Sequence, residues 1–425
     1  MLDRKFIVEN AEAVRENCAN RGMDADIDRF TQLDSLCREK STAAQDLNRQ
    51  ANEVSKSIGK AKTNEEREQR KNEGRALREQ KDAMQTEHDE LLAELIEIQR
   101  SIPNMAHPEA PIGKDDKANL EIKRGKHEPR KFDFKPLDHV ELAEKHDMID
   151  FEAGAKTTGA GFYFLKNDAV LLELALQQFV VQKLVGEGFV ATTTPDLARR
   201  EILEGIGFNP RGNETQIYSI ENTDLCLVAT AEITLGGFLS GETVVDTQLP
   251  IKMCGISHCF RTEAGAAGRA SRGLYRVHQF AKVEMFAFTL PDQSESMLDY
   301  FRELECQIFD ELGIPYRVVD TSTGDLGAPA YRKFDLEAWM PGRGEAGEWG
   351  EVTSTSNCTD YQARRLNVRY KIKDQKGTQF VHTLNGTAIA LSRGIISVLE
   401  NYQEADGSIV IPEALRPYMG KDKIG

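Results

Sequence analysis

Residues 260–286, FRTEAGAAGRASRGLYRVHQFAKVEMF, combine side-chain types that suit a nucleotide. Two strand-like ends flank a loop of Gly, Ala and Ser that carries Arg269, Arg272 and Arg276. Arginine offers a fixed fork of donors to phosphate oxygens, Phe280 can stack on a base, and a second arginine can cover that base by a cation–π contact. Glu263 can accept a hydrogen bond from an exocyclic amine. The stretch therefore predicts a hairpin that binds a phosphorylated base.

Pairing the two ends as antiparallel strands places alternate side chains on one face. Arg261 and Glu263 then share a face. On the return strand one face carries Arg276, His278, Phe280, Lys282 and Glu284, and the other carries Val277, Ala281, Val283 and Met285. A strand with one solvated face would alternate in the same way without any function. The site interpretation is favoured because a solvated face needs neither a Phe among facing charges nor an arginine-bearing loop of small residues.

Two further clusters agree with phosphate chemistry. GEWGEVTSTSN (347–357) is a hydroxyl-rich strand, and a bulge or turn in it would let Glu351 and Ser354 reach one Mg²⁺, which takes oxygen ligands. HTLNGTAIALSRGIISVLENYQ (382–403) reads as a strand that ends at Asn385-Gly386, followed by a helix with Arg393 near its start. Arg393 either holds a terminal phosphate or is an exposed helical arginine.

The elements before these clusters predict a long helical arm over residues 28–100, which contain no proline. A seam with steps of three and four runs through Phe30, Leu33, Cys37, Lys40, Ala44, Leu47, Ala51, Val54 and Ile58. A second seam runs through Leu77, Met84, Leu91 and Ile98, with Leu95 and Ile102 between them. The register is lost around Gly59 to Asn64. Two helices of about 35 residues, roughly 50 Å long, should therefore fold back as an antiparallel coiled coil.

The outer half of the arm is basic. Residues 49–81 hold 10 Lys or Arg against 6 Asp or Glu, although the whole chain of 425 residues has a net charge of −15. This run is either a solvated charged face or a surface that follows a phosphate backbone and releases its counterions. The overall acidity excludes a protein that coats nucleic acid along its entire surface.

The composition and the absence of common motifs limit which other classes of protein the chain can belong to. The seven cysteines show no CxxC pair and indicate free thiols in a reducing cytoplasm; Cys254 and Cys259 near His258 are read as strand residues, with metal binding as the alternative. No signal peptide and no 18-residue apolar stretch that spans a bilayer is expected. Neither GxGxxG after a strand nor GxxxxGK[ST] occurs. Pro103, Pro108 and Pro111 mark a linker.

In order and from end to end, these segments resemble a bacterial-type seryl-tRNA synthetase, a class II aminoacyl-tRNA synthetase. The matching segments are KSIGKAK (56–62), IPN (102–104), PIKM (250–253), CFRTEAGAAGRASRGLYRVHQF (259–280), KVEMF (282–286), EVTSTSNCTDYQARR (351–365), HTLNG (382–386), ALSR (390–393), ENYQ (400–403) and IPEALRPYM (411–419). The element over about 170–195, which ends at Pro195, resembles motif 1 of the class. The hairpin over about 257–286 resembles motif 2, and 382–403 resembles motif 3.

The resemblance implies an α+β fold: an N-terminal antiparallel coiled-coil arm and a catalytic domain with an antiparallel β-sheet flanked by helices. The implied domains are a tRNA-binding domain over 1–105 with its arm at about 28–100, a linker over 106–120, and the class II domain over 121–425. A cytoplasmic homodimer formed through motif 1, with no membrane association, is implied. The implied partners are L-serine, tRNA(Ser), whose long variable arm the coiled coil embraces, and also tRNA(Sec).

The resemblance also implies residue roles. Thr230, Ala231 and Glu232 bind serine, with Glu232 near its ammonium group, while Glu284 and Thr387 hold its hydroxyl group. Arg261, Thr262 and Glu263 hold the α-phosphate and adenine of ATP. The segment from Val277 to Phe280 lines the adenine pocket. Glu351, Val352, Thr353 and Ser354 hold ATP, with Mg²⁺ on Glu351 and Ser354. Arg393 faces the γ-phosphate. The tRNA contacts expected on the arm are Arg49, Lys56, Lys60, Lys62, Arg70, Lys71, Arg75 and Arg78.

Three positions depart from the family pattern. Thr387 stands where Ser is usual, Thr262 replaces the commoner Ser, and Ala270 stands where the motif 2 loop often has an acidic residue. Thr387 keeps the hydroxyl but adds a methyl group near the substrate. Ala270 leaves the contacts of this loop with the acceptor end of tRNA undefined.

The implied reaction has two steps. The serine carboxylate attacks the α-phosphate of ATP, with Arg261 and Arg393 as catalytic residues, and the terminal ribose of tRNA then attacks the acyl carbon. No general base is assigned. A pocket that pairs the serine hydroxyl rejects alanine by about 10⁴-fold, because Glu284 would be left unpaired. Two alternatives stay open at this point: a ligase that loads an amino acid onto a protein carrier, and a non-catalytic tRNA-binding paralogue.

Overall fold

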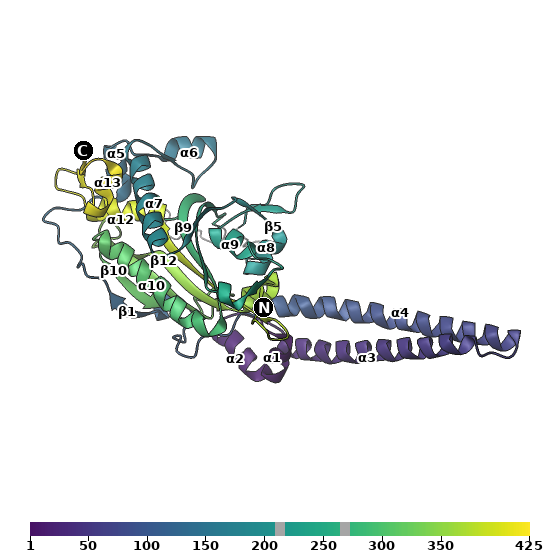
Figure 1. The fold of residues 1–425 in the computed structure, drawn as a ribbon. Coiled ribbons are helices and arrows are strands. Elements are labelled where there is room, and N and C mark those ends of the chain that lie inside the picture. Colours follow the sequence, from purple (N-terminus) through teal and green to yellow (C-terminus); the bar gives the residue numbers. More distant parts are fainter. Residues whose placement is uncertain (209–216, 264–272) are drawn as a thin grey trace. The chain divides into compact units, whose positions relative to one another are not determined.

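The computed structural model describes residues 1–208, 217–263 and 273–425, and the chain divides into two compact units, Met1–Met105 and Ala106–Gly425 (Figure 1). The expectations for Arg269, Ala270 and Arg272 fall on residues outside the described ranges. The two units are built from different elements. The first is built from helices alone, and the second surrounds one large β-sheet.

The first unit is dominated by two long antiparallel helices, as the heptad seams predicted (Figure 1). Its elements are α1 (Arg4–Glu9), α2 (Ala11–Asn20), α3 (Ile27–Ile58) and α4 (Asn64–Ser101). α3 ends at the C-cap Gly59, and Thr63 caps α4 by accepting a hydrogen bond from the backbone N–H of Glu66 at 3.1 Å. The turn between them therefore lies where the sequence lost its register.

The seam is buried most fully in the half of the hairpin away from its turn. α3 buries Phe30, Leu33 and Cys37, and α4 buries Leu95. Lys40, the charged residue within the seam, reaches across to form an ion pair with Glu87. Nearer the turn the buried seam residues of α3 are small, Ala44 and Ala51. There α4 offers Gly74, and a Cβ at that position would lie 3.6 Å from Val54.

An eight-stranded sheet forms the centre of the second unit, with the strand order β1-β10-β11-β12-β15-β9-β8-β4. The strands are β1 (Leu120–Arg124), β4 (Val190–Thr193), β8 (Ile251–Phe260), β9 (Gln279–Thr289), β10 (Tyr316–Asp320), β11 (Arg332–Met340), β12 (Glu348–Thr359) and β15 (His382–Ala390). Neighbouring strands pair antiparallel, except that β4 runs parallel to β8 at the edge. The expected antiparallel sheet is confirmed.

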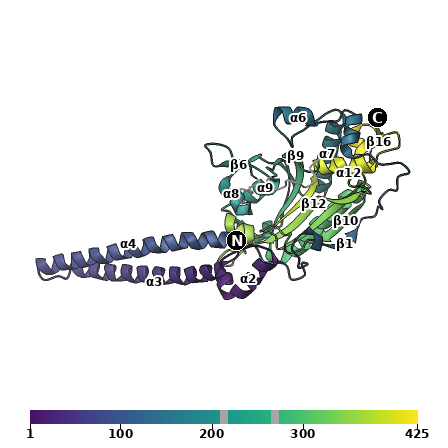
Figure 2. The same cartoon turned by 180° about the vertical axis from the view of Figure 1, so that it is seen from behind.

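Three helices pack on this sheet and share one continuous apolar core with it: α7 (Asp168–Gly186), α10 (Ser294–Glu311) and α12 (Leu391–Asn401). α7 and α12 lie side by side, which is visible from both directions (Figure 2). A second, smaller core joins Phe286 and Phe288 of β9 to three short helices: α8 (Arg200–Ile206), α9 (Ala231–Gly237) and α11 (Tyr361–Leu366). β9 therefore lies between two cores, and its two faces carry different side chains.

β8 and β9 form the hairpin that the sequence predicted, with Cys259 opposite Phe280 and Gly255 opposite Glu284. Val283 and Met285 face the large core, as expected. The strand starts later than expected, at Gln279, so Arg276, Val277 and His278 precede it. The ring of His278 packs against Phe162, and its Nδ1 lies 2.5 Å from the hydroxyl of Tyr218. These three residues therefore do not follow the alternation of the strand.

α7 corrects one expectation about membranes. By length and composition it is long and apolar enough to span a bilayer, and among the described residues it is the one such helix. It also carries Asp168, Glu173 and Lys183, and 39% of its apolar 18-residue segment is buried inside the protein. Its buried side packs on α12 and the sheet through residues such as Leu172, Leu176 and Val180.

Candidate active site

A buried polar cluster lies where β9, β15 and the N-terminus of α9 meet. Thr230, Lys282, Glu284 and Thr387 are 2%, 5%, 2% and 8% exposed. Lys282 forms an ion pair with Glu284, and its Nζ donates to Thr230 Oγ1 at 2.8 Å. Thr230 and Thr387 donate to Glu284 Oε2 at 3.3 and 3.4 Å. The carboxylate of Glu284 is thus surrounded by donors at the floor of the site.

Lys282 is the residue of this cluster that the sequence analysis did not assign to the site. Its Nζ also lies 3.5 Å from Thr387 Oγ1, so it contacts every other member of the cluster. A charged pair this deep is costly to break, because removing one partner leaves the other charge buried and uncompensated. The alternation of the strand already placed Lys282 on the face of Glu284, and that signal was sufficient to find it.

Glu232, in the first turn of α9, lies beside this cluster and has an unusual acidity. Burial, with a further contribution from the nearby charge of Glu284, raises its pKa to about 7. Gln362 and Asn385 both donate to its Oε1, at 2.7 and 2.8 Å. The second oxygen, Oε2, receives no hydrogen bond from a described residue. This carboxyl group is therefore held in one orientation and changes its charge near neutral pH.

Arg261 and Glu263 follow β8 directly. The guanidinium of Arg261 stacks over the ring of Phe280 at 5.4 Å, so the cation–π partner of this arginine is the predicted stacking residue itself. Glu263 accepts a hydrogen bond from Arg276 Nη1 at 2.6 Å and has a positive φ of 52°. This ion pair occupies one of the two carboxylate oxygens of Glu263, the residue that was expected to accept a hydrogen bond from an exocyclic amine. Backbone strain of this kind in a non-glycine residue is concentrated at ligand sites.

β12 contains the bulge that the spacing of Glu351 and Ser354 required. Thr353 pairs with Leu336 and Glu351 pairs with Glu337, which leaves Val352 without a partner on β11. The extra residue turns Glu351 and Ser354 to the same side of the strand. Burial raises the pKa of Asp335, the cross-strand neighbour of Ser354, to about 6 despite the nearby charge of Lys333. Oxygen-bearing side chains therefore gather on this side of β12.

Arg393, near the start of α12, is not an exposed helical arginine. Its side chain is 18% exposed, and its Nη1 donates to the backbone oxygen of Glu351 at 2.8 Å and pairs with the carboxylate at 3.3 Å. Its guanidinium lies 4.6 Å from the ring of Tyr275. Desolvation raises the pKa of Glu351, but Arg393 and Lys333 outweigh it, so the net pKa is lowered and this carboxylate stays charged.

Two cavities open on these residues. One, of about 490 Å³, is lined by Glu232 and Asn385; the other, of about 150 Å³, is lined by Phe280, Glu351 and Arg393. Val277 lines the smaller cavity, although the strand alternation placed it on the apolar side. Both cavities are lined by Arg261, Glu263 and Arg276, so these three side chains form a shared wall. The two cavities adjoin at this wall, and we call them together the connected hollow. Eight further predicted residues line it: Glu232, Val277, Phe280, Glu351, Val352, Thr353, Thr387 and Arg393. The predicted residues that line neither cavity are Thr230, Ala231, Thr262, Glu284 and Ser354.

The arm residues behave differently. Of the eight predicted tRNA contacts, Arg70 is partly buried, where it pairs with Glu66 and donates to the backbone oxygen of Ser57. Arg49 and Lys71 pair with acidic neighbours, and Arg78 donates to Ser55 at 3.0 Å. The others, Lys56, Lys60, Lys62 and Arg75, are exposed and make no ion pair with any residue that the structure describes.

The alternative of a metal site at Cys254, His258 and Cys259 finds no support in the described ranges, where no group of three or more metal-ligating side chains occurs. Burial raises the pKa of the Cys254 thiol to about 11. His258 instead pairs with Asp196 at 2.8 Å. Every one of the seven cysteines is buried and free, as expected.

The sheet, its motif-bearing hairpin and the connected hollow are those of a class II aminoacyl-tRNA synthetase: residues 216–402 match the family model described as the tRNA synthetase class II core domain (G, H, P, S and T). Residues 1–106 match the seryl-tRNA synthetase N-terminal domain. The chain is 64% identical to a serine–tRNA ligase of Rhodopirellula baltica over 99% of both chains, and 57% identical to that of Treponema denticola over 100% of both. It belongs to the seryl-tRNA synthetase family.

Solved structures agree with this assignment. A seryl-tRNA synthetase from Pyrococcus horikoshii, complexed with ATP, superposes with a TM-score of 0.92 at 37% identity and covers 100% of this chain and 99% of its own. The cytoplasmic enzyme of Naegleria fowleri, in complex with AMP, superposes with a TM-score of 0.88 at 33% identity, covering 100% and 98%. The activity of the family is the ATP-dependent joining of serine to tRNA, and this chain is a ligase of that kind.

Proposed function

We propose that the connected hollow activates L-serine with ATP and that the arm presents tRNA(Ser), and also tRNA(Sec), for transfer. The observation that carries the assignment of the hollow is the shared wall, because Arg261 lies where an amino-acid carboxylate from one side meets an α-phosphate from the other. A ligase that activates a carboxylate must bring these two groups within bonding distance.

Serine is recognised by its two polar ends. Glu232 offers its Oε2 to the ammonium group, while Gln362 and Asn385 hold its Oε1. The serine hydroxyl reaches the cluster of Thr230, Glu284 and Thr387, whose oxygens can accept and donate. Ala231, fully buried in the smaller core between Thr230 and Glu232, fixes the positions of these two neighbours. Alanine would leave the buried Glu284 without the bond that serine supplies, which costs a factor of about 10⁴.

ATP binds at the smaller cavity, which at about 150 Å³ encloses only part of a nucleotide. Phe280 and the guanidinium of Arg261 are already stacked, so adenine extends a preformed aromatic and cationic surface. Thr262, Val277 and the bulged segment Val352–Thr353 complete the wall around it. Glu263 keeps one carboxylate oxygen for the exocyclic amine while Arg276 holds the other. Arg393, kept in place by Glu351, meets the γ-phosphate.

Magnesium accompanies ATP as part of the substrate. Glu351 is charged, the bulge places Ser354 on the same side, and such a pair of oxygens fits a cation that keeps waters and binds phosphates. When bound, the ion neutralises negative charge on the phosphate oxygens. The remaining work falls to the chain's own residues.

In the first step the serine carboxylate attacks the α-phosphorus, the bond from that phosphorus to the β-bridging oxygen breaks, and pyrophosphate leaves with the electron pair. Arg261 and Arg393 stabilise the charge that spreads over the phosphate oxygens, so catalysis is positioning and electrostatics. In the second step the terminal ribose hydroxyl of tRNA attacks the acyl carbon, the bond from that carbon to the adenylate phosphate oxygen breaks, and AMP leaves as its phosphate takes up the hydroxyl proton. No side chain is required as a general base.

On the arm, the exposed and unpaired cations Lys56, Lys60, Lys62 and Arg75 are the side chains best able to neutralise tRNA phosphates, because binding there breaks no existing ion pair among the described residues. Lys56 and Lys60 lie at the end of α3 and just beyond it, and Lys62 lies in the turn that follows. The tip of the arm is therefore the proposed contact with the variable arm of tRNA(Ser).

The homodimer is proposed through the motif 1 region. The outward side of α7 exposes Val170, Leu171, Leu174 and Val185 by 38–54%, and Val190 of the edge strand β4 is 60% exposed. Several exposed apolar side chains on a helix beside an edge strand are typical of a subunit interface. The expected sedimentation behaviour is that of a dimer, and a Leu174→Glu variant should shift it to a monomer.

The test of the proposed function is ATP–pyrophosphate exchange with each of the twenty amino acids. Serine should drive exchange, and the other nineteen should stay within background. Exchange with threonine or alanine at a rate comparable to that with serine would contradict the proposal that Glu284 and Thr387 bind the serine hydroxyl group.

A further inference from the structure

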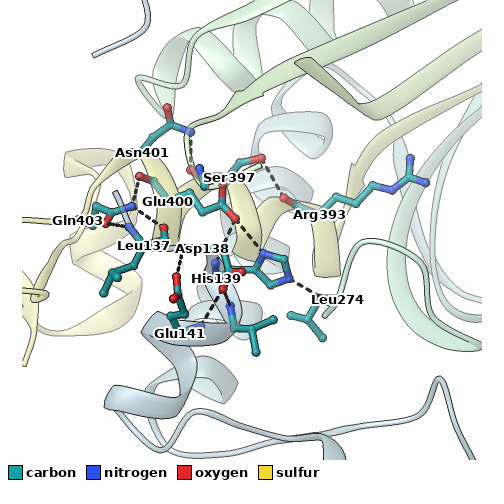
Figure 3. A network of polar contacts seen from close by, with 12 residues as sticks. Leu137, Asp138, His139, Glu141, Leu274, Arg393, Ser397, Glu400, Asn401 and Gln403 are labelled. Atoms are coloured by element: carbon teal, nitrogen blue, oxygen red, sulfur yellow. Dashed lines mark hydrogen bonds and ion pairs between the residues drawn. The ribbon is translucent and has the colours of Figure 1, made fainter. Parts of the chain in front are cut away.

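The ENYQ segment at the end of α12 is strongly buried, although the proposed reaction gives it no role. Glu400, Asn401 and Gln403 are 1%, 6% and 0% exposed. Gln403 donates to the backbone oxygen of Leu137 at 2.9 Å, and Asn401 donates to Ser397 at 2.8 Å. Figure 3 shows these side chains gathered around Glu400, opposite the N-terminus of α5 (His139–Lys145). The segment thus ties α12 to α5.

His139 stands at the centre of this network, and its hydrogen bonds fix which ring nitrogen carries the proton. Its Nε2 lies 3.1 Å from the backbone nitrogen of Leu274, whose N–H can only donate, so Nε2 is the acceptor. Its Nδ1 lies 2.8 Å from Glu400 Oε1 and therefore donates (Figure 3). Glu400 also accepts the backbone N–H groups of His139 and Gly342, at 3.1 and 2.9 Å. The ring is thus held in one tautomer and one orientation.

The acceptor nitrogen of His139 faces the start of the return segment that leads into β9. Gly273 adopts a φ of +78°, and a Cβ at that position would lie 2.0 Å from His139 Nε2, so the backbone passes directly over the ring. Leu274 is fully buried. The next residue, Tyr275, is therefore placed by a backbone that His139 holds on one side.

Tyr275 in turn supports Arg393. The guanidinium groups of Arg393 and Arg343 lie 4.6 and 4.3 Å from its ring centre. Its backbone oxygen accepts from Arg393 Nε at 3.4 Å, and its hydroxyl donates to the backbone oxygen of Glu351 at 3.2 Å. A shift of Tyr275 would therefore move both the arginine and the strand that carries Glu351.

We propose that His139, oriented by Glu400, is a positioning residue for ATP: it fixes Leu274, and through Tyr275 it holds Arg393 where the γ-phosphate binds. His139 itself contacts no reacting atom. The inference rests on the proposed role of Arg393. A purely structural role for the His139–Glu400 pair would join α5 to α12 without affecting ATP selectively, and the two roles predict different kinetics.

Three variants of the full-length enzyme separate these roles. His139→Asn can keep a donor for Glu400 but ends short of Leu274. His139→Gln is long enough to bring a carbonyl oxygen to the place of Nε2 and accept from Leu274. His146→Asn is the matched control, because His146 lies at the C-cap of the same helix and its side chain has one hydrogen-bond partner among the described residues, the backbone oxygen of Gly407 at 2.7 Å.

In serine-dependent ATP–pyrophosphate exchange, His139→Asn should raise the KM for ATP by about tenfold or more and leave the KM for serine unchanged. His139→Gln should recover most of the loss, and His146→Asn should match the parent enzyme. Hydrogen exchange of the peptide that begins at Leu274 should be faster in His139→Asn alone. Equal kinetics in the Asn and Gln variants, or equal rises in both KM values, would overturn the proposal.

Arg393→Ala, measured in the same assay, shows which inference fails. If it raises the KM for ATP while His139→Asn does not, the positioning role is wrong and the proposed function stands. If Arg393→Ala leaves the KM for ATP unchanged, the proposed contact with the γ-phosphate is wrong, and the positioning proposal falls with it. Melting temperatures of all variants show whether any of them is destabilised in general. If His139→Asn is, the proposal is decided by comparing hydrogen exchange of the peptide that begins at Leu274 between His139→Gln and His146→Asn.

Discussion

The arm and the catalytic unit carry their cations in opposite surroundings. On the arm, Lys56, Lys60, Lys62 and Arg75 are exposed to solvent without an ion pair among the described residues. In the catalytic unit Lys282 is 5% exposed and is held by Glu284, Thr230 and Thr387. Both regions use cations, but for different tasks. Exposed cations cost little to keep charged and lend themselves to binding a long polyanion whose counterions are released. A buried, paired cation is fixed in position and suits recognition of one small molecule.

The contrast has a consequence for mutation. A change in the arm should alter the affinity for tRNA with little effect on folding, because surface charges contribute little to stability. A change in the buried cluster should alter both stability and specificity, because each partner of the cluster is desolvated.

The largest effect is expected for Glu284→Ala. The change removes the carboxylate that binds the serine hydroxyl. It also leaves Lys282 buried without its partner, which should lower the free energy of unfolding by about 3–5 kcal/mol. The kcat/KM for serine in exchange should fall by about 10⁴-fold. Glu284→Gln, which keeps the volume and one acceptor, should lose less in both measurements. Exchange within tenfold of the parent enzyme in the Ala variant would remove Glu284 from the serine site.

A smaller effect is expected from pH through Glu232. Because burial raises its pKa to about 7, its carboxyl group becomes neutral as the pH falls below 7 and no longer attracts the serine ammonium group. The KM for serine should therefore rise by up to about tenfold for each pH unit below 7. Exchange kinetics between pH 8 and 6 measure this rise.

Glu232→Gln is the control for that measurement. It is neutral at every pH, so its KM for serine should be higher than that of the parent enzyme at pH 8 and should change little down to pH 6. If the KM of the parent enzyme is equally flat over this range, Glu232 does not contact the ammonium group.

The smallest effect concerns Glu305 of α10, which is 1% exposed and accepts a hydrogen bond from Thr353 Oγ1 at 3.0 Å. Burial raises its pKa well above the usual value. Since the folded-state pKa exceeds the unfolded one, the protonated acid supports the fold at low pH, and this support is lost as the pH rises through the folded pKa. The parent enzyme should therefore lose stability toward alkaline pH.

Glu305→Gln cannot lose a proton and should not share this decline. The two proteins should melt at similar temperatures at pH 5, and the variant should melt a few degrees higher at pH 9, at about 2–4 °C for each kcal/mol. Calorimetry at both pH values gives the comparison. A variant that melts lower at pH 9 would show that the charged form of Glu305 is the stabilising one.

The two regions also differ in what the sequence revealed. The arm follows local rules: a seam with steps of three and four predicted α3 and α4, and the loss of register at 59–64 placed the turn. Arg70 is the exception, since nothing in the local pattern indicated that it would bond back to Ser57 across the turn. In the hairpin of β8 and β9 the two-residue alternation was equally informative from Gln279 onward.

The active site depends on contacts between distant segments, and there local patterns were less sufficient. The spacing of Glu351 and Ser354 called for a bulge, but only the pairing of β11 with β12 shows that Val352 is the extra residue. The environment of Glu232 depends on Gln362, 130 positions away. His139 and Glu400 are separated by 261 positions, and no periodicity connects them. The family resemblance supplied the roles of Thr230 and Thr387 that the patterns did not.

The division of labour between the two regions is tested most directly by one variant of the whole chain, in which Lys56, Lys60, Lys62 and Arg75 are all changed to Glu. Its matched control changes the exposed Lys114, Lys117, Lys373 and Lys376 of the second unit to Glu, with the same change in net charge. Serine-dependent exchange and charging of tRNA(Ser) are measured for both, over a range of salt concentrations. We expect normal exchange in both proteins, charging reduced by about 10²-fold or more in the arm variant alone, and a shallower salt dependence of that charging. Equal charging by the two variants, or a parallel loss of exchange in the arm variant, would contradict it.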